Sequence, residues 1–157
     1  MKIKLLAIGK TDSRGLAELI DNYAVRLKRF ISFEIEIIPD IKNSKNLSET
    51  EQKRKEATVL QSKLNPGDTV ILLDERGKEY SSVEFARFLQ QQMNSGVKQL
   101  VFVIGGPYGV DQSIIKAANA SWSLSRLTFS HQMIRLFAVE QLYRGMSILK
   151  NHPYHHQ

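Results

Sequence analysis

The 157-residue sequence contains no cysteine and no long apolar run. The absence of cysteine excludes disulfide bonds, thiolate zinc sites and a cysteine nucleophile. The first apolar run after Lys4, Leu5–Ile8, is followed at once by Gly9 and Lys10. Such a run is too short for the apolar region of a signal peptide and far too short to span a bilayer. We therefore expect a cytoplasmic protein with no membrane segment.

The two common glycine-rich phosphate motifs are also absent. The sequence contains neither G-x-x-x-x-G-K-[ST] nor G-x-G-x-x-G, so we expect no Walker-type loop and no ordinary dinucleotide-binding turn. The glycine-rich stretch that is present, Gly105–Gly109, includes Pro107, which lacks the backbone N–H that a phosphate cradle would use. A ligand at this stretch is expected to present an uncharged part to it.

The charge of the chain favours an anionic partner. The formal net charge is +6 and the sequence pI is about 9.6. A basic balance of this size makes nucleic acid the first candidate. The Lys and Arg residues are scattered along the sequence rather than gathered in one arm, however. Charge alone is therefore equally compatible with a domain that is basic and binds no nucleic acid.

Strand and helix patterns alternate along the whole chain. This alternation, at this length, predicts one α/β domain over residues 1–157, with a mostly parallel sheet and helices on both faces. The strand that contains Glu34 and Glu36 alternates polar and apolar residues, so it is expected near a sheet edge. Strand patterns cover residues 2–8, 33–37, 69–74 and 100–104, residues 124–129 are strand-like or irregular, and helix patterns cover 13–27, 48–64, 81–95, 111–120 and 131–149.

Two helix starts carry a capping-box pattern. Ser48 is followed three residues later by Glu51, and Ser81 by Glu84. In such a box each side chain satisfies a free backbone donor of the other residue. The first of these helices is expected to place residues 53–56 (Lys-Arg-Lys-Glu) in solvent.

Three expected strand ends are candidate ligand sites. Open α/β sheets bind ligands outside the carboxyl ends of their strands. The three ends are residues 73–75, 105–109 and 124–129. Two of them have a simpler explanation: Gly105–Gly109 could be only a tight turn, and Asp74 could be only a turn-former before Arg76.

The last helix and the tail contain further titratable residues. The tail histidines lack neighbouring acids, so no metal site is expected, and either contact with RNA or simple solvation remains open. His131 is expected to cap or pack against the last helix rather than to catalyse. Arg135 and Arg144 interrupt the apolar pattern of that helix, so each either reaches solvent or binds an anion. The helix is expected to bury Met133, Ile134, Phe137, Leu142 and Met146, and the tail histidines are His152, His155 and His156.

Four short signatures give the chain a resemblance to a known family over nearly its whole length. It resembles the ribosomal large-subunit pseudouridine N3-methyltransferases, the small single-domain SPOUT enzymes. The last two signatures, in this order and near the chain end, are the most specific. The signatures are Ala7-Ile8-Gly9-Lys10, Val103–Gly109, Ser121-Trp122-Ser123-Leu124-Ser125 with Leu127-Thr128-Phe129-Ser130-His131, and Leu142-Tyr143-Arg144 leading to Asn151-His152-Pro153-Tyr154-His155.

The resemblance implies a fold, a cofactor and an assembly. The fold would be the SPOUT α/β fold with a C-terminal trefoil knot, an exception to ordinary chain topology that periodicity cannot reveal. The protein would be a homodimer that binds S-adenosylmethionine, with Gly105 allowing close approach to the ribose. Carried over onto this sequence, the cofactor contacts are Leu73, Gly105, Leu124, Ser125, Arg126, Leu127, Thr128 and Phe129.

The resemblance also implies a reaction on ribosomal RNA. The N3 atom of pseudouridine is a poor nucleophile until it loses its proton, so the site must stabilise a developing anion on the base. Arg144 is the first candidate for that cation, with Tyr154 and His155 completing the site, conceivably from the partner subunit. The general base is left unassigned. Lys150 and Arg135 are candidate contacts to RNA phosphates.

Two rival functions stay open at this point. The first is a SPOUT enzyme that acts on another RNA, such as a transfer-RNA ribose. The second is a non-catalytic ribosome-binding factor that kept the fold. The family's tail signature at residues 151–155 favours the pseudouridine enzymes. The target nucleotide, the need for prior pseudouridylation, the choice between free RNA and assembled ribosome, and a role for residues 40–48 are not indicated.

Overall fold

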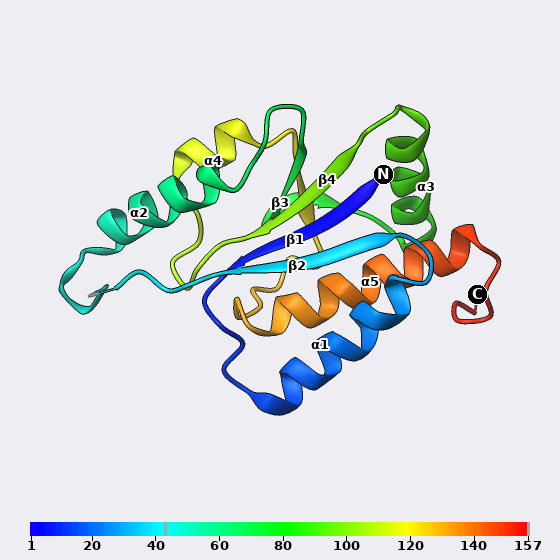
Figure 1. Ribbon diagram of the computed structural model, residues 1–157, viewed down its shortest axis with the longest axis horizontal. Coiled ribbons are helices and arrows are strands. Elements are labelled where there is room, and N and C mark those ends of the chain that lie inside the picture. The colour runs from blue at the N-terminus through cyan, green and yellow to red at the C-terminus, as the bar shows by residue number, and fades with distance from the viewer. Residues whose placement is uncertain (43, 157) are drawn as a thin grey trace.

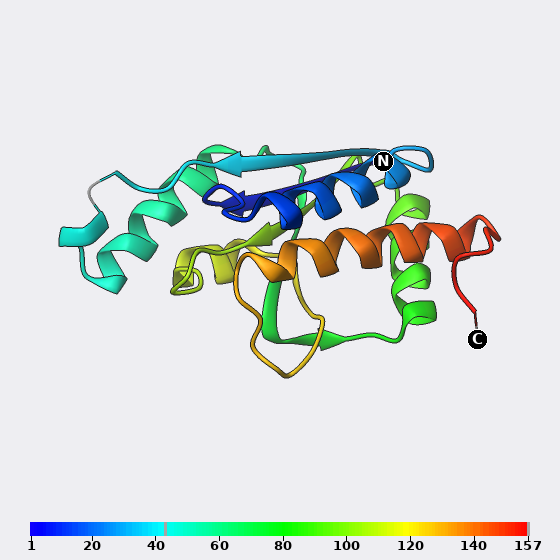
Figure 2. The same cartoon turned by 90° about the horizontal axis from the view of Figure 1, so that it is seen from below.

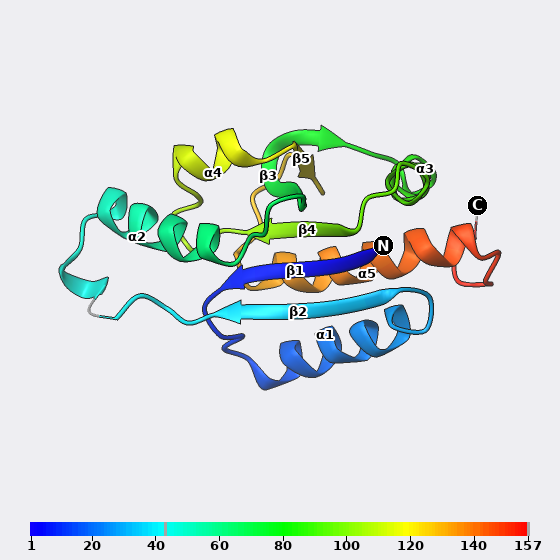
Figure 3. The same cartoon turned by 45° about the horizontal axis from the view of Figure 1, so that its top comes forward.

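In the computed structural model, which describes residues 1–42 and 44–156, five strands form one parallel sheet in the order β2-β1-β4-β3-β5 (Figures 1 and 3). Asn43, within the polar stretch 40–48, and Gln157 lie outside the described residues. The prediction of a parallel α/β sheet is confirmed, and β2 lies at an edge as expected. The strands are β1 (Lys2–Ile8), β2 (Ser32–Ile38), β3 (Thr69–Glu79), β4 (Gln99–Ile104) and β5 (Ala120–Ser123).

Helices cover both faces of the sheet, because alternate strand residues point to opposite faces. In β1, Ile3, Leu5 and Ala7 join the core beneath α1, α3 and α5, whereas Leu6 and Ile8 join the core beneath α2 and α4. Helices α1 and α5 accordingly lie on the opposite side of the sheet from α2 and α4 (Figure 1). The helices are α1 (Arg14–Leu27), α2 (Glu49–Ser62), α3 (Ser82–Asn94), α4 (Gln112–Ala117) and α5 (Met133–Leu149), and Ser44–Asn46 form a short 3₁₀ turn, η1.

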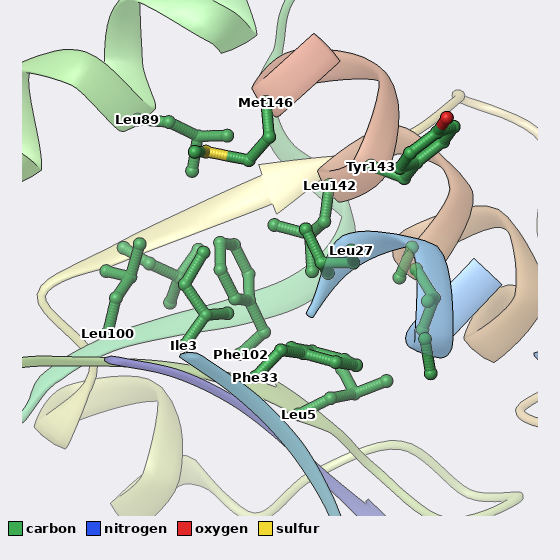
Figure 4. Packing of buried hydrophobic residues seen from close by; sticks show 14 of the residues in the cluster. Ile3, Leu5, Leu27, Phe33, Leu89, Leu100, Phe102, Leu142, Tyr143 and Met146 are labelled. Carbon is green, nitrogen blue, oxygen red and sulfur yellow. The ribbon is translucent and has the colours of Figure 1, made fainter. Parts of the chain in front are cut away.

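The larger core holds α5 between its neighbours. Figure 4 shows Leu142 and Met146 of α5 facing Phe102 of the sheet and Leu89 of α3. Each large apolar side chain that is buried in this way contributes about 1.5–3 kcal/mol. A Cβ at Gly145 would lie 2.9 Å from Leu89 Cδ1, so glycine permits the close approach of α5 to α3.

One expectation about the helices is confirmed and another is wrong. Both capping boxes are confirmed, at Ser48 with Glu51 and at Ser81 with Glu84. The expected solvent exposure of Glu56 is wrong, because its residue surface is only 3% exposed. One apolar turn of α2 faces the sheet, and Glu56 lies on that face with Leu60.

Strands β3 and β5 differ in extent from the strands that the sequence predicts. Strand β3 continues to Glu79, with a register shift between Leu73 and Lys78 in its pairing with β5. The segment Ala120–Ser123 is a strand, whereas residues 124–129 are a loop. A four-residue strand of Ala-Ser-Trp-Ser carries no clear periodic signal, so its pairing with β3 decides its conformation.

The expected burial in α5 is only partly right. Leu142 and Met146 are buried and Ile134 is partly buried, but Met133 and Phe137 are 41% and 38% exposed. Within the described residues, no helix combines the length and apolar character needed to cross a membrane. The C-terminal knot implied by the resemblance stays a prediction.

Candidate functional site

A cavity of about 520 Å³ opens at the carboxyl edge of the sheet, a volume typical of small-ligand sites. It lies between the ends of β3 and β4 and the loop that connects β5 to α5. Seven of the eight predicted cofactor residues line it: Leu73, Gly105, Leu124, Ser125, Leu127, Thr128 and Phe129. The eighth, Arg126, is not among the lining residues; its side chain is 89% exposed, and its Nε lies 3.5 Å from Glu79 Oε1.

The glycine-rich turn at 105–109 forms one wall of this cavity. The N–H of Gly109 donates to the carbonyl of Gly106 at 3.0 Å, and Gly109 has a φ of 80°. A Cβ at Gly105 would lie 2.7 Å from Val110 Cγ1 and 2.9 Å from the Gly109 carbonyl. Gly105 is therefore needed for the turn to fold back on itself. The expectation that it also allows close approach of a ligand stays a prediction.

The loop at residues 124–131 forms the opposite wall and is held by its own hydroxyl groups. Ser123 Oγ donates to the Ser125 carbonyl at 2.9 Å, and Ser125 Oγ accepts from the Leu127 N–H at 3.0 Å. The Thr128 hydroxyl donates to Glu75, which lies in the irregular part of β3. These bonds give the backbone of the loop a defined course around the cavity.

Asp74 lies at the mouth of the cavity and is paired locally. Its carboxylate accepts from the Arg76 backbone N–H at 2.8 Å and from the Arg76 guanidinium at 3.1 Å. The Arg76 hydrogen bond holds the pKa of Asp74 below its ordinary value. These contacts agree with the simpler interpretation of Asp74 as a turn-former.

Arg135 does not have either predicted role. Its residue surface is 1% exposed, so the side chain neither reaches solvent nor offers a surface contact to an RNA phosphate. Its guanidinium donates to the carbonyls of Ile8 at 2.5 Å, Gly9 at 2.8 Å and His131 at 2.9 Å. Arg135 therefore ties the start of α5 and the end of the cavity loop to the carboxyl end of β1.

His131 lines the cavity next to this arginine. It does not cap α5, whose N-cap residue is Gln132. Burial lowers the pKa of His131, and the positive charge of Arg135 lowers it further. The imidazole is therefore neutral at pH 7, since its ordinary pKa is already near 6.5.

The three predicted catalytic side chains lie together at the far end of α5. Arg144 Nη2 donates to Glu140 at 2.5 Å, and its guanidinium stacks over the Tyr154 ring at 4.7 Å. Arg144 Nη1 lies 3.3 Å from Nδ1 of His155. The Tyr154 hydroxyl donates to Glu140 at 2.8 Å and lies 3.1 Å from the Tyr23 hydroxyl. The tail is thus folded back onto α5 and α1.

Burial of the Tyr154 phenol raises its pKa, and its hydrogen bonds with Tyr23 and Glu140 raise it further. The phenol therefore stays protonated at neutral pH, where it donates a hydrogen bond and does not act as a base. An arginine N–H can only donate. His155 Nδ1 is consequently an acceptor where it faces Arg144.

Two residues of this cluster were missed from the sequence. Glu140 is four residues before Arg144 on α5, and that spacing alone predicts an ion pair. Tyr23 comes from α1, and no sequence signal links it to a tail more than a hundred residues away. Only the packing of α1 against α5 brings it to Tyr154.

The tail cluster and the cavity are separate within one chain. Ile134 lines the cavity, and Arg144 lies about 15 Å further along α5 at about 1.5 Å per residue. Figure 2 shows the tail at the opposite end of α5 from the loop that precedes the helix. In residues 1–42 and 44–156 there is also no group of three or more His, Cys, Asp or Glu that could hold a metal ion.

Comparison with known proteins gives closely similar relatives of the same length. The family model described as "Predicted SPOUT methyltransferase" matches residues 1–155. A protein of Flavobacterium johnsoniae named "Ribosomal RNA large subunit methyltransferase H" is 62% identical, and one of the same name from Parabacteroides distasonis is 54% identical. In both cases the match covers 100% of this chain and 100% of the relative.

Solved structures show the same fold at low sequence identity. A "probable methyltransferase" from Bordetella pertussis is 11% identical, with a TM-score of 0.57, and the match covers 92% of this chain and 96% of that chain. A methylase family protein from Neisseria gonorrhoeae is 13% identical, with a TM-score of 0.51, and the match covers 99% of this chain and 85% of that chain. At these identities the likeness bears on the fold alone.

Proposed function

The chain belongs to the SPOUT methyltransferase family, and we propose that it methylates large-subunit ribosomal RNA with S-adenosylmethionine as the methyl donor. One observation carries the proposal. Relatives named "Ribosomal RNA large subunit methyltransferase H" match the chain from end to end, at up to 62% identity among those compared. The basic charge of +6 supports an RNA substrate. A ribosomal substrate also supports the expected cytoplasmic location, and we retain the prediction of one domain over residues 1–157.

The cavity fits the proposed cofactor in size and in chemistry. Its walls are the loop 124–129 and the turn 105–109, so it offers backbone groups and apolar surfaces of Leu73, Leu124 and Leu127. Such a lining suits the adenosine part, which carries hydrogen-bonding edges and a flat apolar face. When bound, the cofactor supplies an electrophilic methyl group on a sulfonium. The chain holds and orients that group and limits the access of water.

The finer target that we propose is N3 of a pseudouridine. The site must then stabilise negative charge on the base as the N3 proton leaves, and a fixed cation does this well in a partly dehydrated site. Arg144 is held in one orientation by Glu140 and by the Tyr154 ring. Tyr154 stays protonated, and because its one O–H is donated to Glu140, its part is to orient Arg144 through the ring. The general base remains unassigned.

A homodimer would bring the two parts of the site together. One chain places its tail cluster about 15 Å from its own cavity. The face of α5 nearest the cavity exposes Met133 and Phe137, and the adjoining loop exposes Leu127 at 75%. Exposed apolar groups gathered in this way are typical of a contact surface. We propose that a second copy covers them and that Arg144, Tyr154 and His155 of that copy reach the cavity.

The test is methyl transfer to defined RNA. The purified protein would be incubated with labelled S-adenosylmethionine and with assembled ribosomes from cells that lack the enzyme, and the label located by nuclease mapping and mass spectrometry. Label on one large-subunit pseudouridine is the expected result. Transfer to transfer RNA alone would contradict the ribosomal assignment. Absence of both transfer and cofactor binding would favour a non-catalytic ribosome-binding factor, which need not hold the cofactor.

A further inference from the structure

The carboxyl group of Glu56 lies directly behind the cavity wall. Glu56 belongs to α2 and is 3% exposed, and its Oε1 accepts from the Gln52 amide at 2.8 Å. A Cβ built on Gly106 would lie 2.7 Å from Glu56 Oε2 and 2.9 Å from Oε1. Gly106 itself lines the cavity, whereas Glu56 does not. The thickness of one glycine therefore separates this carboxyl group from the ligand space.

A carboxyl group at this position is costly for the fold. None of the ion pairs among the described residues includes Glu56. Burial raises its pKa; the Gln52 hydrogen bond lowers it in part, and the charge of Asp40 raises it. A buried acid without a cation destabilises a protein relative to an apolar side chain, which would suit the neighbouring core residues Ala57 and Leu60. Departures of this kind from the apolar pattern are expected where function requires them.

We propose that Glu56 is a positioning residue that holds the Gly105–Gly109 turn in the shape that binds the cofactor. The inference rests on the function proposed above. A Cβ on Gly106 would point into these carboxyl oxygens, so the carboxyl group packs against the turn without itself lining the cavity. Few other contacts hold the turn in place among the described residues, because its own backbone hydrogen bond joins only Gly106 and Gly109. Without Glu56 the backbone of the turn can move away from the ligand.

This role predicts an effect on cofactor affinity and not on the chemical step. Glu56 lies behind the turn, on the far side from the cavity, and does not belong to the Arg144 cluster. Its replacement should therefore raise the KM and Kd for the cofactor and leave kcat at saturating cofactor nearly unchanged. A purely structural role would instead lower the unfolding temperature and, through a smaller folded fraction, the apparent kcat, while KM would stay unchanged.

The first experiment compares Glu56→Leu and Glu56→Gln with the matched control Glu49→Gln. Glu49 is an exposed acid on the same helix, so its replacement makes the same chemical change away from the turn. Titration calorimetry should show that Glu56→Leu binds S-adenosylmethionine about tenfold more weakly than the wild type, a difference of about 1.4 kcal/mol. The control should bind like the wild type. Glu56→Gln keeps the side-chain size and should fall between them, without a lower unfolding temperature.

The second experiment uses the steric relation between the two residues. Gly106 has no positive φ, so alanine is allowed by its backbone, and the three atoms nearest to its Cβ would all belong to the Glu56 carboxyl group. Gly106→Ala should weaken cofactor binding, and the double variant Gly106→Ala with Glu56→Ala should bind more tightly than Gly106→Ala alone. Such a cycle measures coupling directly, and it decides the matter even if Glu56→Leu does not fold.

The outcomes separate this inference from the proposed function. Wild-type protein that fails to bind S-adenosylmethionine would refute the proposed function. Wild-type binding with unchanged affinity in Glu56→Leu, or additive effects in the Gly106 cycle, would refute only the role of Glu56.

Discussion

The guanidinium of Arg135 lies 2.8 Å from the carbonyl oxygen of Gly9, although the two residues are 126 positions apart. The same side chain also holds the Ile8 and His131 carbonyls. One buried cation thus fixes the end of β1, the end of the cavity loop and the start of α5. The cavity depends on this contact for its shape, because its loop is attached to the sheet there.

Replacement of Arg135 by Met should destabilise the protein strongly. Two buried carbonyls and one partly buried carbonyl would lose their donor, at a cost of about 2–4 kcal/mol in the free energy of unfolding. Urea denaturation measures this change, and Arg135→Lys should recover part of it. If Arg135→Met is as stable as the wild type and binds RNA more weakly, the result would support the phosphate contact against which the burial of Arg135 argues.

Replacement of Arg144 by Ala should abolish most turnover and leave cofactor binding intact. Removal of a fixed charge-stabilising donor lowers kcat by about 100-fold or more, and the proposed role of Arg144 is toward the RNA base and not toward the cofactor. Single-turnover methyl transfer and calorimetry with S-adenosylmethionine measure the two properties separately. Equal turnover in the variant would remove Arg144 from the mechanism.

The Tyr23→Phe variant tests whether the tail must be held in place. The change removes only the hydroxyl that lies 3.1 Å from the Tyr154 hydroxyl and keeps the ring that packs beside Tyr143. Loss of one hydrogen bond costs about 1 kcal/mol, so we expect turnover to fall severalfold with a small change in stability. Tyr80→Phe, which removes a hydroxyl outside both the tail cluster and the cavity lining, is the matched control. Identical rates for both variants would mean that this contact does not position the tail.

Stability should depend on pH through Glu56. Burial raises the folded-state pKa of Glu56 above its ordinary value of 4.5, so the folded state binds a proton that the unfolded state has released. Stability therefore falls as pH rises from about 4.5 through the raised value, and the full cost is present above it. Glu56→Gln should unfold at a higher temperature than the wild type at neutral pH. The difference should vanish as pH falls to about 4; a difference that is constant with pH would contradict the assignment.

Lys150 remains the untested candidate for a phosphate contact. It is exposed at the end of α5, where the tail begins. If it neutralises one phosphate, Lys150→Ala should weaken RNA binding and reduce the slope of log affinity against log salt by about one unit. Binding titrations at several salt concentrations measure this slope. An unchanged slope would place the docking surface elsewhere.

Much of the fold is encoded locally, and the sequence predicts that part well. The β-branched and aliphatic residues of β1 predict a buried strand, and the polar alternation around Glu34 predicts a strand at an edge. Ser48 with Glu51 and Ser81 with Glu84 predict helix starts, because capping acts over three residues. The carboxyl ends of parallel strands lie at one edge of a sheet, so the location of the cavity also follows from the order of the elements.

The tertiary structure decided what depends on contacts between distant segments. The sequence alone determined that the chain is a basic, cysteine-free α/β protein with strand ends suited to a ligand, because periodicity and capping are local. It could not determine that Glu56 is buried against Gly106, that Arg135 binds backbone carbonyls instead of an anion, or that Ala120–Ser123 forms a strand. The charge and hydropathy of a side chain indicate whether it favours water over the protein interior. The partners that packing supplies decide whether a buried charge is tolerated and what it does there.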